Sequence, residues 1–127
     1  MEVRDGLRYS DDHEWLALKG DVGTVGVTAY AADQLGDIVF VELPAVGTPL
    51  SAGQVFGVIE SVKAVSDLLA PVAGEVLAVN GALAGAPELV NSDPYGDGWM
   101  VRLRLVDPAQ AAALKDAAAY RDLTKAG

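Results

Sequence analysis

The sequence predicts a mainly β protein built as a sandwich or barrel rather than around a parallel sheet. Short apolar runs rich in valine recur along the chain, and glycine or proline clusters separate them. Many short strands with this punctuation are typical of sandwiches and barrels. The chain has 127 residues, which fits one domain large enough to bury a core without disulfides or structural metals.

Each expected element follows from a local pattern. Alternating apolar residues or uninterrupted apolar runs predict strands over 13–19 and 22–28 around a Gly-Asp turn, then over 37–43, 54–60, 67–71, 74–80 and 99–105. Thr28 is the expected N-cap of a helix over 29–35, and Gly36 its stop. Pro87 opens a helical turn ending near Asn91, and Asp107 with Pro108 starts an alanine-rich C-terminal helix through about Tyr120.

These elements predict a single domain over residues 1–127, with a core over about 7–106 and a C-terminal helical segment over about 108–124. The formal net charge of −9 argues against nucleic acid and anionic membranes as partners, and favours partners with basic docking surfaces. No apolar run has the length of a membrane span, and the N-terminal residues are too acidic for a signal peptide. We therefore expect a cytoplasmic monomer.

No catalytic or metal site is expected. His13 is the sole histidine, and no nucleophile pattern accompanies it, so a structural role is expected. The glycines of residues 20–26 match no phosphate-binding loop, and the acidic residues near His13 lack EF-hand spacing. The chain has no cysteine, so any thiol chemistry has to come from an attached group.

Lys63 is the one residue with chemical promise. It is the only basic residue between Lys19 and Arg102, and it lies between two apolar runs. An exposed lysine that discourages strand pairing is the simple alternative. The β-branched Val62 and Val65 favour a stiff, projecting loop instead, in which a modifying enzyme meets one unique amine.

At these residues the sequence resembles a known family. The stretch "VIESVKAVSDLLAPVAGEVLAVN" is similar to the H proteins of the glycine cleavage system, together with "HEW", "GDIVFVELPAVG" and "PELVNSDPYGDGWM". The Glu-Ser-Val-Lys-Ala motif differs from the Asp-Lys-Ala of 2-oxo acid dehydrogenase domains and the Met-Lys-Met of biotin carriers. The resemblance runs from about Leu7 to Tyr120, and only Val65 departs, where alanine or threonine is commoner.

The resemblance implies a flattened barrel-sandwich hybrid with short flanking helices and a C-terminal helix, like other lipoyl and biotinyl domains. It implies lipoate on Lys63, attached by a lipoyl ligase or lipoyl transferase. The carrier would take an aminomethyl group of glycine from a pyridoxal phosphate-dependent glycine decarboxylase (P protein) to a tetrahydrofolate-dependent aminomethyltransferase (T protein). Dihydrolipoyl dehydrogenase (L protein) would then reoxidise it. The protein would be a shuttled substrate, not an enzyme.

The resemblance also places Glu14, in "HEW", near the docked arm, and Asp67 is a second candidate contact. We expect a half-exposed carboxylate in a shallow groove, which would prefer the loaded, cationic arm over the neutral disulfide or dithiol.

Two alternatives to the glycine cleavage carrier remain open at this point. One is a lipoyl relay protein that passes lipoate to other enzymes or serves another lipoate-dependent pathway. The other is an unmodified binding or scaffold protein that retains the fold.

Overall fold

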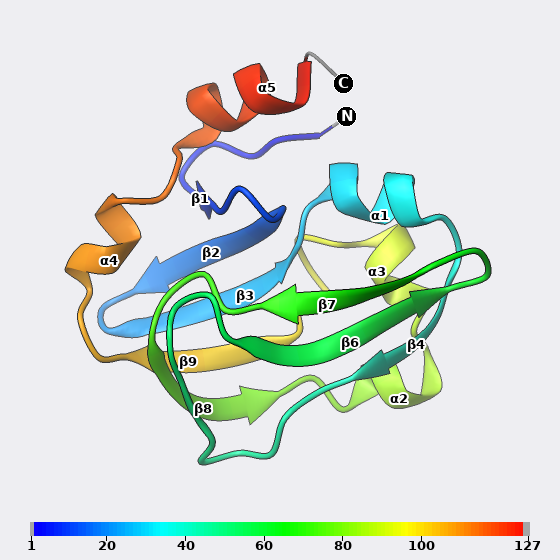
Figure 1. The fold of residues 1–127 in the computed structure, drawn as a ribbon, viewed down its shortest axis with the longest axis horizontal. Helices are drawn as coiled ribbons and strands as arrows, with labels where there is room; N and C mark the ends of the chain where they lie inside the picture. The colour runs from blue at the N-terminus through cyan, green and yellow to red at the C-terminus, as the bar shows by residue number, and fades with distance from the viewer. Residues whose placement is uncertain (1, 126–127) are drawn as a thin grey trace.

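The computed structural model describes residues 2–125 and contains two β-sheets that pack face to face (Figure 1). Residues 1, 126 and 127, which the predicted domain includes, lie outside the described residues. One sheet has six strands in the order β1-β2-β3-β9-β8-β5, and the other has three in the order β4-β6-β7. All their pairings are antiparallel. The predicted mainly β sandwich is confirmed, and its sheets do not close into a barrel.

The strands of the larger sheet are β1 (Arg8–Tyr9), β2 (Glu14–Lys19), β3 (Val22–Val27), β9 (Val101–Leu105), β8 (Gly74–Val79) and β5 (Pro49–Leu50). The strands of the smaller sheet are β4 (Ile38–Glu42), β6 (Val55–Ser61) and β7 (Val65–Leu69). The helices are α1 (Ala29–Leu35), α2 (Ala82–Gly85), α3 (Leu89–Ser92), α4 (Ala109–Ala112) and α5 (Ala117–Lys125). None of the helices within residues 2–125 combines the length and the hydropathy that a membrane span requires.

The main core lies between the two sheets. Its buried side chains come from both, with Ile59 and Leu68 from the smaller sheet and Val25, Val76 and Leu103 from the larger one. Each such burial stabilises the fold by about 1.5–3 kcal/mol relative to an exposed side chain. A second, aromatic cluster packs where α5 meets the larger sheet: Tyr9, Trp15, Tyr95, Ala117 and Tyr120.

The expected start and stop of the first helix are confirmed. The Thr28 hydroxyl oxygen accepts a hydrogen bond from the Ala31 amide at 3.2 Å, which satisfies a donor that the first helical turn would otherwise leave free. Gly36 follows α1 with φ of 84°, a left-handed conformation that glycine adopts without steric cost.

The prediction of one continuous C-terminal helix is wrong. The chain forms α4 and α5 with a break at Lys115, whose amide and carbonyl pair with the carbonyl and amide of Tyr9 at 2.9 and 2.8 Å. Both groups of Lys115 are thereby taken out of the helical pattern. Asp116 then restarts the helix, because its side chain accepts a hydrogen bond from the Ala119 amide at 2.9 Å.

Smaller differences concern element boundaries. The strand expected over 67–71 runs from Val65 to Leu69, and the turn expected over 87–91 is the helix Leu89–Ser92. The short elements β1, β5 and α2 were not predicted. The two residues of β5 pair with β8, a long-range contact that leaves no periodic signal in so short a segment.

We expect Gly57→Ala to destabilise the fold. Gly57 lies at an irregularity of β6, and a Cβ there would collide with the carbonyl oxygen of Glu42. Overpacking against backbone costs about 1–3 kcal/mol. Gly85→Ala is the matched control, because no atom lies within 4 Å of a Cβ at that position. Urea unfolding should show a large decrease in the free energy of unfolding for Gly57→Ala and little change for Gly85→Ala. Equal stabilities of the two variants would contradict the expected collision.

Candidate functional site

Lys63 lies at the tip of the β6–β7 hairpin, in the loop 62–64. Ser61 closes this loop: its amide donates to the Ala64 carbonyl at 2.8 Å, and its hydroxyl oxygen accepts from the amides of Ala64 at 3.0 Å and Lys63 at 3.3 Å. The Val62 amide donates to the Asp37 carbonyl at 3.1 Å, which ties the tip to the residue before β4. The serine thus supplies the local hydrogen bonds of a tight turn, which explains how the loop forms without glycine, proline, asparagine or aspartate.

The tip projects into solvent. Val62 and Val65 are 71% and 66% exposed, and Lys63 is exposed between them. Within the described part of the chain, Lys63 takes part in no ion pair. Its Cε lies 3.5 Å from the point where a Cβ would stand on Gly36, so its methylenes run toward the end of α1. An exposed primary amine on a pinned loop is a fitting acceptor for an acyl group.

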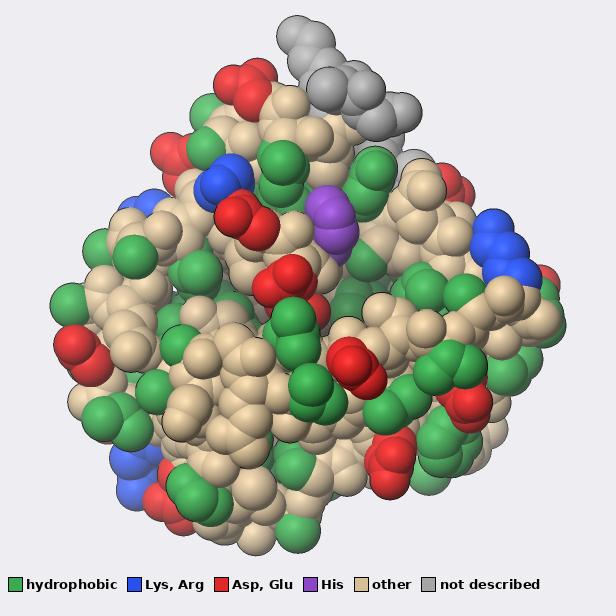
Figure 2. Space-filling view, in the orientation of Figure 1, with side chains coloured by type: hydrophobic (Ala, Val, Ile, Leu, Met, Phe, Trp, Pro, Cys, Tyr) green, Lys and Arg blue, Asp and Glu red, His purple; other side chains and the backbone are tan. Residues whose placement is uncertain are grey.

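The solvent face of the smaller sheet carries acidic and apolar side chains in two rows. Strand register aligns Phe40, Glu60 and Val65 in one row. It aligns Glu42, Val58 and Asp67 in the next row. Over β6 and β7 in Figure 2, red acidic side chains accordingly lie among green hydrophobic ones. The face beside Lys63 therefore presents negative charge and apolar area together.

Glu14 opens β2 and is only 3% exposed, so the expectation of a half-exposed carboxylate in a shallow groove is wrong. Ser10 donates its hydroxyl to Oε1 of Glu14 at 2.7 Å, and the Ser10 hydroxyl oxygen accepts from the Glu14 amide at 3.1 Å. The Leu69 amide, on the free edge of β7, points to Oε2 at 3.4 Å. Glu14 thereby bridges the larger sheet to the strand that leads from Lys63.

Burial raises the pKa of Glu14 to about 8, and the hydrogen bonds from Ser10 and Leu69 oppose that rise only in part. Desolvation disfavours the charged form of a carboxyl group, so this residue is largely protonated at neutral pH. Carboxyl groups whose pKa is strongly raised by burial cluster at functional sites, so a buried carboxyl poised near neutral pH is a functional-site candidate. Glu14 is therefore the second chemically distinctive residue of the molecule.

Asp67 is exposed on β7, two residues before Leu69. Asp67 is thus on β7 itself, and Glu14 of β2 contacts the same strand further from Lys63, at Leu69. A strand rises about 3.3 Å per residue, so Asp67 lies at most about 13 Å and Leu69 at most about 20 Å along the chain from Lys63.

The other singled-out residues have packing roles. His13 Nδ1 lies 2.7 Å from the Tyr120 hydroxyl, and Figure 2 shows the histidine (purple) next to acidic side chains. Trp15 is buried and donates its ring N–H to the Pro94 carbonyl at 3.0 Å, while Arg102 stacks over Trp99 at 4.1 Å from the ring centroid. Within residues 2–125, no group of three or more His, Cys, Asp or Glu side chains is placed to hold a metal ion.

Sequence reasoning missed Ser10 and Ser61. Both serines act on a residue three or four positions away, Glu14 and Ala64 respectively. A serine just before a projecting loop is a recognised turn signal, so Ser61 was available to sequence reasoning. The partnership of Ser10 with a carboxyl group depends on the turn between them, which no spacing rule for strands predicts.

The pKa of Glu14 predicts how stability changes with pH. The native state keeps the Glu14 proton up to about pH 8, whereas an unfolded glutamate loses it near its ordinary value of 4.5. Between those values the native state binds the extra proton, so this residue makes stability fall as pH rises, by at most about 1.4 kcal/mol per pH unit. Urea unfolding between pH 5 and 8 should therefore show a flatter pH dependence for Glu14→Gln than for wild type. Glu75→Gln, at an exposed position of β8, is the control; identical pH slopes for all three proteins would contradict the assignment.

Comparisons with known proteins identify the family and the fold of the chain. The family model described as "Glycine cleavage H-protein" matches residues 7–127. The glycine cleavage system H protein of Chlorobium limicola is 57% identical over 125 residues, covering 97% of this chain and 98% of that protein. The H protein of Magnetococcus marinus is 58% identical over 120 residues, covering 94% of this chain and 86% of that protein.

A solved structure shares the fold as well. The crystal structure of a glycine cleavage system H protein from Mycobacterium marinum superposes with a TM-score of 0.89 at 37% sequence identity, covering 97% of this chain and 99% of that one. Family model, relatives and solved structure all cover nearly the whole chain. The chain belongs to the glycine cleavage H-protein family, whose members are lipoyl carriers rather than catalysts.

Proposed function

We propose that the protein carries lipoate in amide linkage on Lys63 and serves as the aminomethyl shuttle of the glycine cleavage system. In this role it takes the aminomethyl group of glycine from the decarboxylase, delivers it to the aminomethyltransferase and is reoxidised by dihydrolipoyl dehydrogenase. The observation that carries the proposal is the placement of Lys63, an exposed amine on a loop pinned by Ser61 and Asp37.

The surroundings of Lys63 suit acylation by a lipoyl ligase or lipoyl transferase. Its Nζ, once deprotonated, attacks an activated lipoyl carbonyl, and the amide forms as the activating group leaves. Only four methylene groups separate the amine from the backbone of the loop, so the acylating enzyme has to contact the loop and its apolar flanks, Val62 and Val65. Amide formation removes the only positive charge carried by the β6–β7 hairpin, residues 55–69, and the acidic rows that remain favour partners with basic surfaces.

The attached group supplies what the chain lacks. When bound, the lipoyl disulfide accepts the aminomethyl group on one sulfur and a proton on the other, and it is restored by oxidation once the group has left. A chain without cysteine has no thiol of its own that would exchange with that disulfide. The role of the protein is then to present the arm and to protect the loaded amine.

Asp67 and Glu14 are the proposed contacts of the loaded arm. A chain of about twelve bonds, from the Lys63 Cα to the ring sulfur, reaches roughly 15 Å when extended. Asp67, at most about 13 Å away, therefore lies within reach. Glu14, next to Leu69, is reached only by a fully extended arm, and only where the separation from Lys63 is well below the upper bound of about 20 Å. Along the path of the arm the first carboxyl group, that of Asp67, is exposed and the second, that of Glu14, is buried.

Burial changes what Glu14 does for the loaded arm. An ammonium group that arrives beside Glu14 favours its ionised form, so docking is coupled to release of the Glu14 proton. The neutral disulfide and dithiol states give no such gain, and the carboxyl group stays protonated. The buried position also excludes water from the amine, which is prone to hydrolysis while it is attached through sulfur.

We expect Lys63→Arg to fold normally and to carry nothing. Surface substitutions usually change stability by no more than about 0.5 kcal/mol, and arginine offers no amine for acylation. The measurement is the intact mass of wild type and variant from a lipoylating host, followed by glycine cleavage with the partner enzymes. Lipoate on the variant, or wild type that stays unmodified, would overturn the proposal. Lipoylated wild type that the decarboxylase does not load would point to a lipoyl relay protein instead.

We expect Glu14→Gln to shorten the lifetime of the loaded carrier. Wild type and variant are loaded by the decarboxylase, separated from it, and followed for ammonia release without the folate-dependent enzyme. Ammonia should be released several-fold faster from Glu14→Gln and moderately faster from Asp67→Asn, because each variant removes one carboxylate from the path of the arm. Glu75→Gln, at an exposed position of β8, is the control, and equal rates for all proteins would exclude a protective role for both residues.

A further inference from the structure

Tyr120, on the C-terminal helix, joins three separate segments through one hydroxyl group. The residue is fully buried, and its hydroxyl lies 2.7 Å from the Thr28 hydroxyl and 2.7 Å from His13 Nδ1. Its ring stacks on that of Tyr9 with centroids 4.5 Å apart. The side chain thus links α5 to the N-cap of α1 and to the residue that immediately precedes Glu14.

His13 has a strained backbone. Its φ of 68° is the only positive value at a non-glycine residue within residues 2–125. Such a conformation costs an L-residue about 1–2 kcal/mol and persists only where the surroundings hold it. The His13 carbonyl accepts from the Thr28 amide at 3.0 Å, and its amide donates to the Ser10 carbonyl at 3.2 Å. The turn between Ser10 and Glu14 is therefore held at its midpoint.

The protonation states of His13 and Tyr120 are compatible with the hydrogen bonds of the Tyr120 hydroxyl. Burial lowers the pKa of His13 below its usual value and raises the pKa of Tyr120. Near neutral pH the imidazole is uncharged and the phenol keeps its proton. The Tyr120 hydroxyl then donates to one neighbour and accepts from the other, which satisfies both polar partners in a site that burial makes costly to leave unpaired.

We propose that Tyr120 is a positioning residue for Glu14: its hydroxyl holds His13 in the left-handed turn that sets the Glu14 carboxyl between Ser10 and the edge of β7. The effect on Glu14 follows from the contacts of this chain alone. The consequence for the loaded arm rests on the proposed function.

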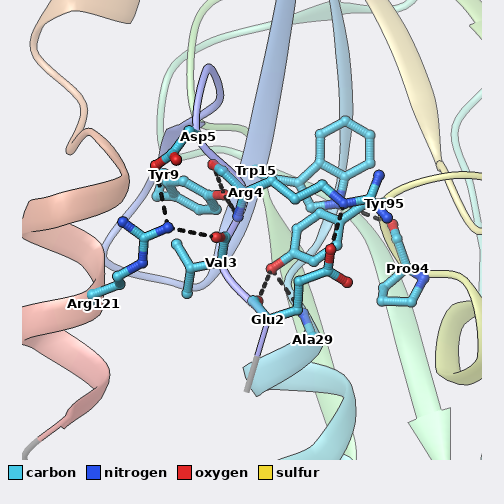
Figure 3. Close-up of polar contacts among 10 residues, drawn as sticks. All are labelled: Glu2, Val3, Arg4, Asp5, Tyr9, Trp15, Ala29, Pro94, Tyr95 and Arg121. Atoms are coloured by element: carbon cyan, nitrogen blue, oxygen red, sulfur yellow. Dashed lines mark hydrogen bonds and ion pairs between the residues drawn. The ribbon is translucent and has the colours of Figure 1, made fainter.

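The contact between the Tyr120 hydroxyl and His13 depends on the docking of the C-terminal helix, α5. Figure 3 shows Arg121 of α5 reaching the N-terminal segment, where it donates to the Val3 carbonyl at 2.8 Å and pairs with Asp5 at 3.1 Å. Tyr9, beneath Tyr120, exchanges hydrogen bonds with the backbone of Arg4 at 2.8 and 2.7 Å. Release of the helix would withdraw Tyr120 from His13 and free the turn that carries Glu14.

The test compares Tyr120→Phe with Tyr95→Phe in the unlipoylated full-length protein. Tyr95 is a matched control, because its buried hydroxyl also bonds to α1, at the Ala29 amide, and to the Glu2 carbonyl, but not to His13. The readout is the titration midpoint of the Glu14 carboxyl by carbon-13 NMR, assigned by its loss in Glu14→Gln. Thermal unfolding shows that each variant is folded.

We expect the Glu14 midpoint to fall by at least one pH unit in Tyr120→Phe and to stay at the wild-type value in Tyr95→Phe. Neither substitution changes a charge near neutral pH, so a shift reports a change of geometry. An unchanged midpoint in a folded Tyr120→Phe protein would overturn the proposal.

A second variant keeps the proposal testable should Tyr120→Phe be poorly folded. Asparagine adopts left-handed backbone conformations more readily than histidine, so with asparagine at position 13 the turn depends less on contacts from Tyr120. In the double variant Tyr120→Phe with His13→Asn, the titration midpoint of Glu14 should return most of the way to the wild-type value. No recovery in a folded double variant would contradict the role of the His13 backbone.

Decay of the loaded carrier separates this inference from the proposed function. Tyr120→Phe should release ammonia nearly as fast as Glu14→Gln, and Tyr95→Phe should match wild type. Should Glu14→Gln itself decay at the wild-type rate, the protective role of Glu14 fails, and the positioning role of Tyr120 is decided by the titration alone.

Discussion

Burial of one face of the β6–β7 hairpin is the interaction on which the rest of the molecule depends. Ile59 and Leu68 are each 1% exposed and pack into the core between the sheets, whereas Val62, Lys63 and Val65 stand in solvent. Alternation along a strand makes this possible, because successive side chains point to opposite faces. The core fixes the hairpin up to Ser61, and the hydrogen bonds of that serine fix the last three residues. A rigid base with an exposed tip is what a covalently attached arm requires.

Glu14 shows how a costly residue is accommodated beside that hairpin. A buried carboxyl group is destabilising when charged, yet here it has partners for both oxygens, and no buried side-chain nitrogen or oxygen in the described residues lacks a hydrogen bond. The expense is a strained His13 and a network of aromatic residues around Tyr120. Strain of this kind tends to occur near functional sites, where surrounding contacts are strong enough to maintain it.

Much of the fold followed from local patterns in the sequence. The strands around the core, the Thr28 cap, the Gly36 stop and the projecting position of Lys63 all depend on residues close together in the chain. What could not be predicted depends on distant residues: the pairing of Lys115 with Tyr9 that breaks the C-terminal helix, and the contact of β5 with β8. The site divides in the same way. Lys63 was evident from its isolation among acidic residues, but the contact of Glu14 with the Leu69 amide comes from β7, which the sequence places far from it.

The contact between Arg121 and the Val3 carbonyl means that the two ends of the described chain lie side by side. The ends lie at a different edge of the molecule from the β6–β7 tip (Figure 1). Neighbouring termini are what circular permutation needs, because a short linker then closes the chain without disturbing the sheets. The order of segments along the polypeptide could therefore be changed by circular permutation without altering how the hairpin presents Lys63. A tether or a second carrier unit fused at this end would leave the hairpin free to enter a partner.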